Sequence, residues 1–194
     1  DEAGSAFSDS TVSVDHFDTA FTFQLTSATA DGFTFTIQRV GPTALGGVGG
    51  GLGYSGIPSS VAIKFDLYDN AGEGNDSTGL FINGDGPTVP SGAHPVEASV
   101  DMSSSSVDLH SGDVMQATLH YDGTTLQETI TDTVTHASFT HSYAINIPST
   151  IGGSTAYVGF TGATGGATAV QDILTWTYTP LPAPPATPTN LTVT

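Results

Sequence analysis

A dense set of oxygen donors lies in one segment of the chain, residues 66–76, which reads DLYDNAGEGND. Carboxylates and amides recur there along a glycine-containing loop, and such donors are the ligands that a hard cation such as Ca²⁺ prefers. The segment is not an EF-hand, because its glycine and glutamate spacings differ and no helical pattern flanks it. Two readings stay open on these residues alone, a cation site and a solvated acidic loop.

Two other segments have the composition of ligand-contacting loops. Asp31-Gly32 precedes an alternating apolar run, a position where Asp-Gly is ordinarily a turn. Residues 49–54 read GGGLGY, and glycines let a backbone approach a ligand closely. The glycine run is not a phosphate-binding loop, since no Lys follows it and no helical pattern opens after it. Each segment, taken singly, is most simply a loop.

Charge and composition exclude several classes of function. The 194 residues include 2 Lys+Arg against 19 Asp+Glu, which gives a net charge of −17. Binding to nucleic acid or to an anionic membrane surface requires basic residues, so both are excluded. The chain has no Cys, which excludes disulfides and thiolate metal sites. No apolar run is long enough to span a membrane, and 37% hydrophobic residues suffice for a core.

The elements that must position these loops are strands. Apolar residues alternate with polar ones at Phe21–Leu25, Phe33–Ile37 and Val61–Leu67, and no sustained helical period occurs. Further strands are predicted at 114–121, 125–134, 139–147, 155–161 and 172–179, with turn residues between them. Many short strands with polar outer faces predict a single antiparallel β-sandwich or barrel over residues 1–179. Residues 180–188 then form a Pro-rich linker, and 189–194 are either the start of a fibronectin type III module or a disordered tail.

Several of these pieces, in this order, resemble the legume (L-type) lectin domain and its bacterial relatives in the concanavalin A-like superfamily. They are residues 21–38, 49–54, 60–66, 156–165 and 172–178, and the resemblance covers roughly residues 3–179. It implies an all-β fold, an antiparallel jelly-roll sandwich with a shallow saccharide pocket at one loop end. The family's first strands have no counterpart here. Either they were removed, or a partner chain fills the open sheet edge, with self-association as a consequence.

The resemblance also implies a sugar site. Asp31 would follow a cis Ala30–Asp31 peptide bond and accept hydrogen bonds from sugar hydroxyls. The glycine run at Gly50 and Gly51 would offer a backbone N–H, and Asn70 would offer its amide. The loop 162–167, with Gly165 and Gly166, would close the pocket. Tyr54, Tyr68 and Phe81 are the aromatic candidates for stacking on a sugar, with core packing as the more natural role of Phe81.

A calcium site beside the sugar is implied in the same way. Its ligands would be Asp66, the Tyr68 carbonyl, Asn70, and either Asn75 or Asp76. The family's neighbouring transition-metal site is not expected, because Lys64 stands where the family has a ligating Glu and the downstream His is missing. We expect the Lys64 ammonium to replace the second cation, to pair with Asp66 and to leave a site for Ca²⁺ alone.

Catalysis is not expected. The glucanases of the same superfamily need a pattern such as Glu-x-Asp-x-x-Glu, and none of the glutamates here stands in one. Glu128 and Asp132 share a strand face without a third acid, and no Gly-x-Ser-x-Gly elbow occurs. The sequence therefore predicts a non-catalytic, calcium-dependent carbohydrate-binding module of a larger secreted bacterial protein, located outside the cell or on its surface. The alternative is a structural or adhesive sandwich that assembles by strand exchange and binds no sugar.

Overall fold

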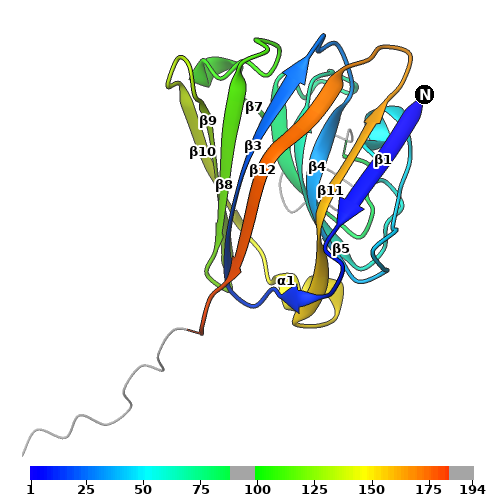
Figure 1. Ribbon diagram of the computed structural model, residues 1–194, viewed down its shortest axis with the longest axis vertical. Helices are drawn as coiled ribbons and strands as arrows, with labels where there is room; N and C mark the ends of the chain where they lie inside the picture. The colour runs from blue at the N-terminus through cyan, green and yellow to red at the C-terminus, as the bar shows by residue number, and fades with distance from the viewer. Residues whose placement is uncertain (88–98, 184–194) are drawn as a thin grey trace, which may run out of the picture.

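The computed structural model describes residues 1–87 and 99–183, which fold into two packed antiparallel sheets (Figure 1). The seven-stranded sheet has the order β1-β11-β4-β5-β6-β7, with β2 also paired to β11. Its strands are β1 (Glu2–Phe7), β2 (Val12–Ser13), β4 (Gly32–Gln38), β5 (Ser60–Asp66), β6 (Ser77–Ile82), β7 (Val100–Asp101) and β11 (Thr155–Thr164). The five-stranded sheet has the order β10-β9-β8-β3-β12. Its strands are β3 (Phe17–Thr26), β8 (Val114–Tyr121), β9 (Thr125–Asp132), β10 (Ser138–Ala144) and β12 (Val170–Pro180).

Helical structure in the described residues is limited to single turns. These are the 3₁₀ turns η1 (Gly49–Gly51) and η2 (Ser103–Ser105) and the α-helix α1 (Ile147–Ile151). The Asn146 side chain caps α1 by accepting the Ser149 N–H, and Gly152 ends the helix in a left-handed conformation. The predicted all-β jelly-roll sandwich is confirmed.

The space between the sheets is filled mainly by aromatic side chains. Alternate residues of β3 point inward, among them Phe21 and Phe23, because successive side chains of a strand face opposite sides. Phe33 of β4 stacks on Phe65 of β5 with ring centroids 4.6 Å apart. Phe21 meets Phe160 of β11 edge-on at 5.0 Å. Each such side chain contributes roughly 1.5–3 kcal/mol by its burial.

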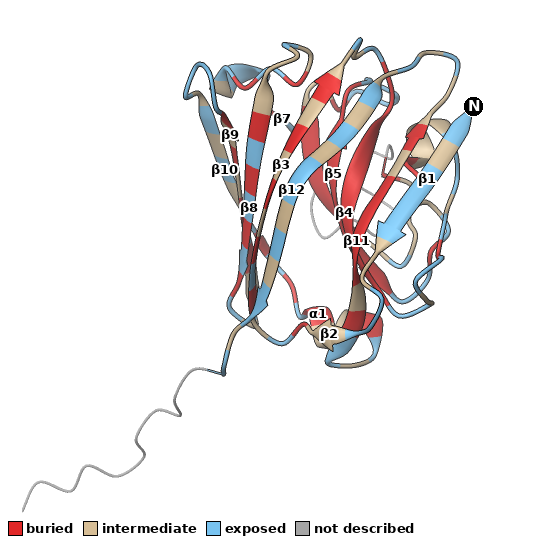
Figure 2. Cartoon of the chain, in the orientation of Figure 1, coloured by how far each residue is buried: buried red, intermediate tan, exposed pale blue. Residues whose placement is uncertain are grey.

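The central strands β4 and β5 are buried on both faces, as Figure 2 shows. On the face away from the core, their polar side chains hydrogen-bond to each other and to the loop that covers them. Thr34 contacts Thr161 at 2.8 Å, and the Thr161 hydroxyl donates to the Leu52 carbonyl. Buried polar groups are tolerated when they are paired in this way. The loop between β4 and β5 is thus fixed on the sheet.

The two ends of the sandwich differ in what they carry. Along the β3–β12 pair, Val170 lies opposite Thr26 at one end, and Pro180 lies opposite Phe17 at the other. The loops after β3 and β11, which contain Asp31 and Gly165, are therefore at the first end. The chain leaves β12 at the second end, where the Leu181 N–H donates to the His16 carbonyl. A ten-residue strand such as β3 separates these ends by about 34 Å.

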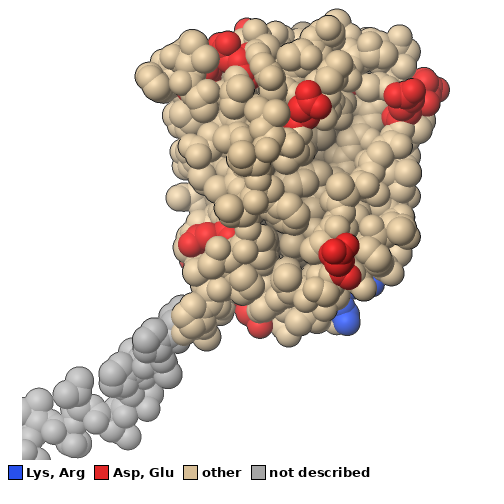
Figure 3. Space-filling view, viewed as in Figure 1, with Lys and Arg blue, Asp and Glu red and all other residues tan. Residues whose placement is uncertain are grey.

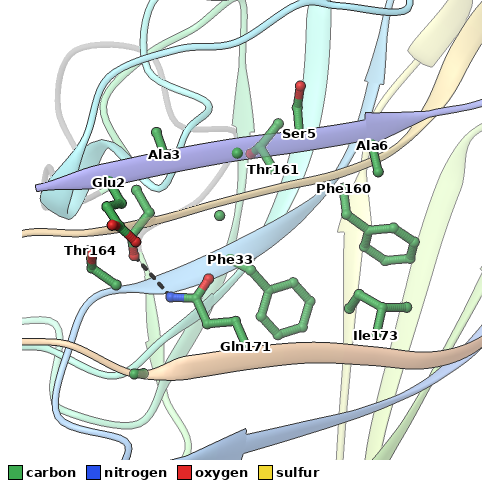
Figure 4. Close-up of a pocket in the computed structure, with 14 residues that line it drawn as sticks. Glu2, Ala3, Ser5, Ala6, Phe33, Phe160, Thr161, Thr164, Gln171 and Ile173 are labelled. Atoms are coloured by element: carbon green, nitrogen blue, oxygen red, sulfur yellow. Dashed lines mark hydrogen bonds between the residues drawn. The ribbon is translucent and has the colours of Figure 1, made fainter.

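One side of the sandwich is open, between the edge strands β1 and β12 (Figure 4). A groove of about 450 Å³ lies there, with Phe33, Phe160 and Ile173 among its lining residues. β1 offers little to fill it, because the residues that share a face with Phe160 of β11 are only Glu2, Gly4 and Ala6.

All the strands predicted from alternation occur, with ends shifted by a few residues. β1, β2, β6 and β7 were not predicted. β6 was not predicted because its sequence, STGLFI, does not alternate apolar and polar residues, and β2 and β7 have only two residues each. Of the predicted linker 180–188, only residues up to Ala183 are described, and 189–194 lie outside the described residues.

Candidate functional site

Asp31 lies where three strands of the larger sheet end together. It precedes β4, and the Ala30–Asp31 peptide bond is cis. Its carbonyl accepts the Leu67 N–H at 2.8 Å, just after β5, and its own N–H points to the Ala163 carbonyl of β11 at 3.4 Å. The residue is 5% exposed, and its Oδ2 has no hydrogen-bond partner among the described residues. Burial raises the pKa of Asp31, and the facing Gly165 N–H opposes that rise.

Two glycine loops close around the Asp31 carboxylate. A Cβ added at Gly165 would lie 3.2 Å from Asp31 Oδ2 and 3.4 Å from the Gly49 Cα. A Cβ added at Gly49 would lie 3.8 Å from the same oxygen. Gly49 has φ +60, a conformation that favours glycine, and it begins the turn η1 that contains Gly50 and Gly51. Because glycines have no side chains, both backbones can approach the Asp31 carboxylate closely.

The structure thus brings Gly49, the first residue of η1, and Gly165 close to the Asp31 carboxylate. The sequence did not predict Gly49 itself as a site residue, although Gly49 belongs to the glycine run 49–54. A Cβ at Gly166 would meet nothing within 4 Å, so that position borders open space. The loop 165–169 is tied to the loop before Asp31, since the Thr29 N–H and hydroxyl both donate to the Thr168 carbonyl.

The aromatic candidates separate clearly by burial. Tyr54 and Phe81 are buried and belong to a second small core, and the Tyr54 hydroxyl accepts hydrogen bonds from Ser60 and Gly84. Neither ring can stack on a bound sugar. Tyr68 is 46% exposed and Asn70 is exposed, on the loop that follows β5. Tyr68 is therefore the remaining aromatic candidate.

Below that loop lies a group of buried charges. The Lys64 Nζ is 2.8 Å from Asp66 Oδ2 and 3.8 Å from Glu73 Oε1, and the three side chains are at most 1% exposed. The predicted pairing of Lys64 with Asp66 is thus present, and Glu73 is an addition that sequence reasoning missed. The sequence did offer one signal for Glu73, because a buried lysine is stabilised by having more than one counter-charge close by. Burial raises the pKa of Asp66 to about 6, although Lys64 acts to lower it.

Asp76 faces a different set of partners. Its Oδ1 accepts the Leu109 N–H at 2.7 Å and contacts His110 Nδ1 at 3.2 Å, while His110 Nε2 contacts the Leu67 carbonyl. Asp76, Asp108 and His110 offer ligand atoms within 4.8 Å of one another, a possible metal-binding cluster. His110 lies 34 residues from Asp76, and no spacing in the sequence pointed to it.

The predicted calcium ligands do not fit that ion in their present arrangement. Lys64 and the Tyr68 N–H engage the two oxygens of Asp66, and the Asp69 N–H donates to Asn75 Oδ1 at 3.1 Å. An ammonium at 2.8 Å from a carboxylate oxygen repels a divalent cation from that group. At the Lys64 position, a protonated ammonium also offers no lone pair to a transition metal.

Comparison with known proteins decides the family. The model of the legume lectin domain matches residues 5–192. The chain belongs to the legume lectin domain family. Solved legume lectins share its fold at low identity. The lectin from Bauhinia forficata in complex with GalNAc has 24% identity and a TM-score of 0.71, over 91% of this chain and 78% of that chain.

Two more lectins align over the same share of this domain. Lectin II from Ulex europaeus has 18% identity and a TM-score of 0.74, with 81% of its chain covered. The metal-free form of lectin I-B4 from Griffonia simplicifolia has 21% identity and a TM-score of 0.73, with 80% of its chain covered. At these identities the likeness establishes the fold alone.

Family membership establishes a carbohydrate-binding, lectin-like role and confirms that this lectin domain is not an enzyme. The packing around the acids agrees, because Glu128 is fully buried between the sheets and cannot reach a substrate. Legume lectins generally bind metal ions and are typically extracellular or surface-associated. In the part of the lectin domain that the structure describes, no helix has the length and hydrophobicity to cross a bilayer.

Proposed function

We propose that this lectin domain binds a saccharide reversibly at Asp31, between the glycine turn η1 and the loop after β11. One observation carries the proposal: the Asp31 carboxylate is buried, yet its Oδ2 has no hydrogen-bond partner among the described residues. An unsatisfied buried acceptor costs about 1–3 kcal/mol or more. Sugar hydroxyls would satisfy it as donors, so part of the binding energy comes from relieving that cost.

The surrounding groups suit a pyranose with neighbouring hydroxyls. The backbone N–H of Gly50 would donate to one sugar oxygen, with Gly51, Gly165 and Gly166 forming the walls. Asn70 would donate from its amide, and Tyr68 would pack its exposed ring on an apolar sugar face. The glycine loops are fixed on the sheet by buried hydrogen bonds, so little ordering is required on binding. A relative, the Bauhinia forficata lectin, was solved with GalNAc, which makes galactose-type sugars the first ligands to try.

Secretion is the finer part of this proposal, and calcium dependence, which the family resemblance implies, is left out of it. Of the side chains that would hold the ion, Asp66, Asn75 and Asp76 already engage protein donors. An extracellular module of a larger bacterial protein agrees with the family's usual location.

A glycan array read with and without EDTA tests the proposal, followed by titration calorimetry on the best ligand. We expect saturable binding to at least one glycan class and its loss in Asp31→Ala, with the melting temperature retained. A folded protein that binds no glycan on a broad array would contradict the proposal. The EDTA arm shows separately whether a metal ion takes part.

The free edge of β12 favours a second candidate, a structural module that pairs with another copy of itself. β12 has eleven residues and one charged side chain, Asp172, while Val170 and Leu174 are about half exposed. Long edge strands without charges invite pairing. Sedimentation at increasing concentration tests this: dimers that Leu174→Lys abolishes would support it, whereas a monomer throughout would refute it.

A further inference from the structure

Lys64 is a fixed cation inside the protein. It stands on β5 opposite Thr34 of β4 and Gly79 of β6, and its side chain is fully buried. A buried ammonium is stable only with close counter-charges, which Asp66 and Glu73 provide. The Phe81 ring also lies 5.7 Å from Nζ, within reach of a cation–π interaction.

Each of the two carboxylates turns one oxygen toward Lys64 and the other toward a backbone N–H. Asp66 accepts a hydrogen bond from Lys64 with Oδ2 and one from the Tyr68 N–H with Oδ1 at 3.2 Å. Glu73 Oε1 lies 3.8 Å from Lys64, an ion-pair contact without a hydrogen bond, and Oε2 accepts the Ala71 N–H at 2.7 Å. The ammonium therefore fixes, through two carboxylates, the backbone on both sides of Asn70.

The rest of the loop is closed by donors of the chain itself. The Asp69 N–H donates to Asn75, and the Leu109 N–H donates to Asp76. These acceptors are the side chains that a calcium ion would otherwise gather. Three of the predicted metal ligands, Asp66, Asn75 and Asp76, thus have partners within the protein.

We propose that Lys64, with Asp66 and Glu73, holds the loop 67–76 in place of divalent metal ions, so that Tyr68 and Asn70 are positioned without calcium or a transition metal. Lys64, Asp66 and Glu73 act as positioning residues. The role of Tyr68 and Asn70 toward a sugar rests on the proposed function, whereas metal titration and hydrogen exchange need no sugar.

The first test uses the unchanged protein. Hydrogen–deuterium exchange of the segment 67–76 and the melting temperature are measured in EDTA, in CaCl₂ and in MnCl₂, with calorimetric titration of each metal salt. We expect equal exchange in the three conditions and no saturable metal binding. Saturable binding of either metal, accompanied by slower exchange of this segment than in EDTA, would overturn the proposal.

The second test compares two variants of the same loop. Glu73→Gln removes one charge facing Lys64, while Asp69→Asn removes one exposed charge and keeps its acceptor oxygen. We expect exchange in 67–76 to rise about tenfold in Glu73→Gln and to stay at the wild-type rate in Asp69→Asn, because only the first weakens the loop's anchor. Equal exchange in the two variants would overturn the role of Glu73. Failure to bind any glycan would contradict the proposed function, but it would not affect the metal titrations or the hydrogen-exchange measurements.

Discussion

At the scale of single residues, the binding role proposed for Asp31 comes with a cost in stability. Its carboxylate is buried, incompletely satisfied and raised in pKa by burial. A neutral amide of the same shape avoids part of the desolvation penalty but cannot accept with both oxygens. The proposed binding role therefore predicts that replacing Asp31 separates stability from sugar binding.

We expect Asp31→Asn to weaken glycan binding by about 10-fold or more, since one charge-assisted hydrogen bond is lost. The melting temperature should stay the same or rise by a few degrees. Calorimetry of binding and thermal denaturation check the two parts. A fall in melting temperature above about 5 °C, with weak binding explained by unfolding, would show a mainly structural role.

Glu128 is a second buried acid, on the inner face of β9. Thr78 donates to its two oxygens at 3.0 and 2.9 Å, and Tyr143 donates at 3.1 Å. His141 is its neighbour across the β9–β10 pair. Burial raises the pKa of Glu128 to about 8, despite the lowering effect of these hydroxyls. The carboxyl is therefore neutral in the folded protein near pH 7.

This pKa predicts a stability that decreases as the pH rises. Below about pH 4.5 the group is protonated in both states and contributes no pH dependence. Between about pH 4.5 and 8 only the unfolded chain loses the proton, so stability falls by up to roughly 5 kcal/mol from this residue. Urea unfolding at pH 5 and pH 8 measures the difference.

The matched variants are Glu128→Gln, which mimics the neutral acid, and Glu2→Gln at an exposed position. We expect the first to reduce the pH dependence strongly and the second to leave it as in the wild type. An unchanged slope in Glu128→Gln would mean that this carboxyl is not what makes the fold pH-dependent.

At the scale of elements, the candidate site depends on how closely two loops approach. Gly165→Ala places a Cβ 3.2 Å from Asp31 Oδ2, tighter than most such contacts, so the loop after β11 must shift. We expect about tenfold weaker glycan binding, measured by calorimetry. Gly47→Ala is the control in the neighbouring glycine run, because its Cβ would be 3.7 Å from the Ser55 Cβ. Equal effects of both changes would argue against a special role of the Gly165 contact.

Strands in which apolar and polar residues alternate could be predicted from the sequence, whether or not one face is exposed, and strands without that alternation could not. β3, β4 and β8 alternate in this way and were recognisable, while β6 does not and gave no period. For the site, resemblance located Asp31, the η1 glycines and Lys64. It could not locate Glu73 or His110, because their partners are set by how the loops 67–76 and 102–113 fold against the sheet ends. Side-chain contacts of this kind arise from tertiary packing and leave no local pattern.

At the scale of the whole molecule, charge is the main feature. The net charge is −17, and on the face seen in Figure 3 the acidic side chains are scattered rather than gathered into one patch. Like charges distributed over a surface repel one another and destabilise the folded state, and salt screens that repulsion. Lys64 does not reduce the repulsion at the surface, since it is buried with its own counter-ions.

We expect the melting temperature at pH 7.5 to rise by about 2–5 °C when NaCl is increased from about 20 mM to about 500 mM. The increase should nearly vanish close to pH 4.1, the sequence pI, because the net repulsion is absent there. Thermal scans at the two pH values check this. An equal rise in melting temperature at both pH values would show that salt acts by a mechanism other than screening of charge repulsion.

The separation of the two ends of the sandwich has a practical consequence when the protein is immobilised on a surface. Since the chain leaves β12 beside His16 and Asp31 lies at the opposite end, a molecule immobilised through its C-terminal side holds the proposed sugar-binding loops away from the support. Neighbouring copies on a bead or sensor surface then point the same way. Dense glycans could bridge them, and avidity would make even millimolar single-site affinities measurable.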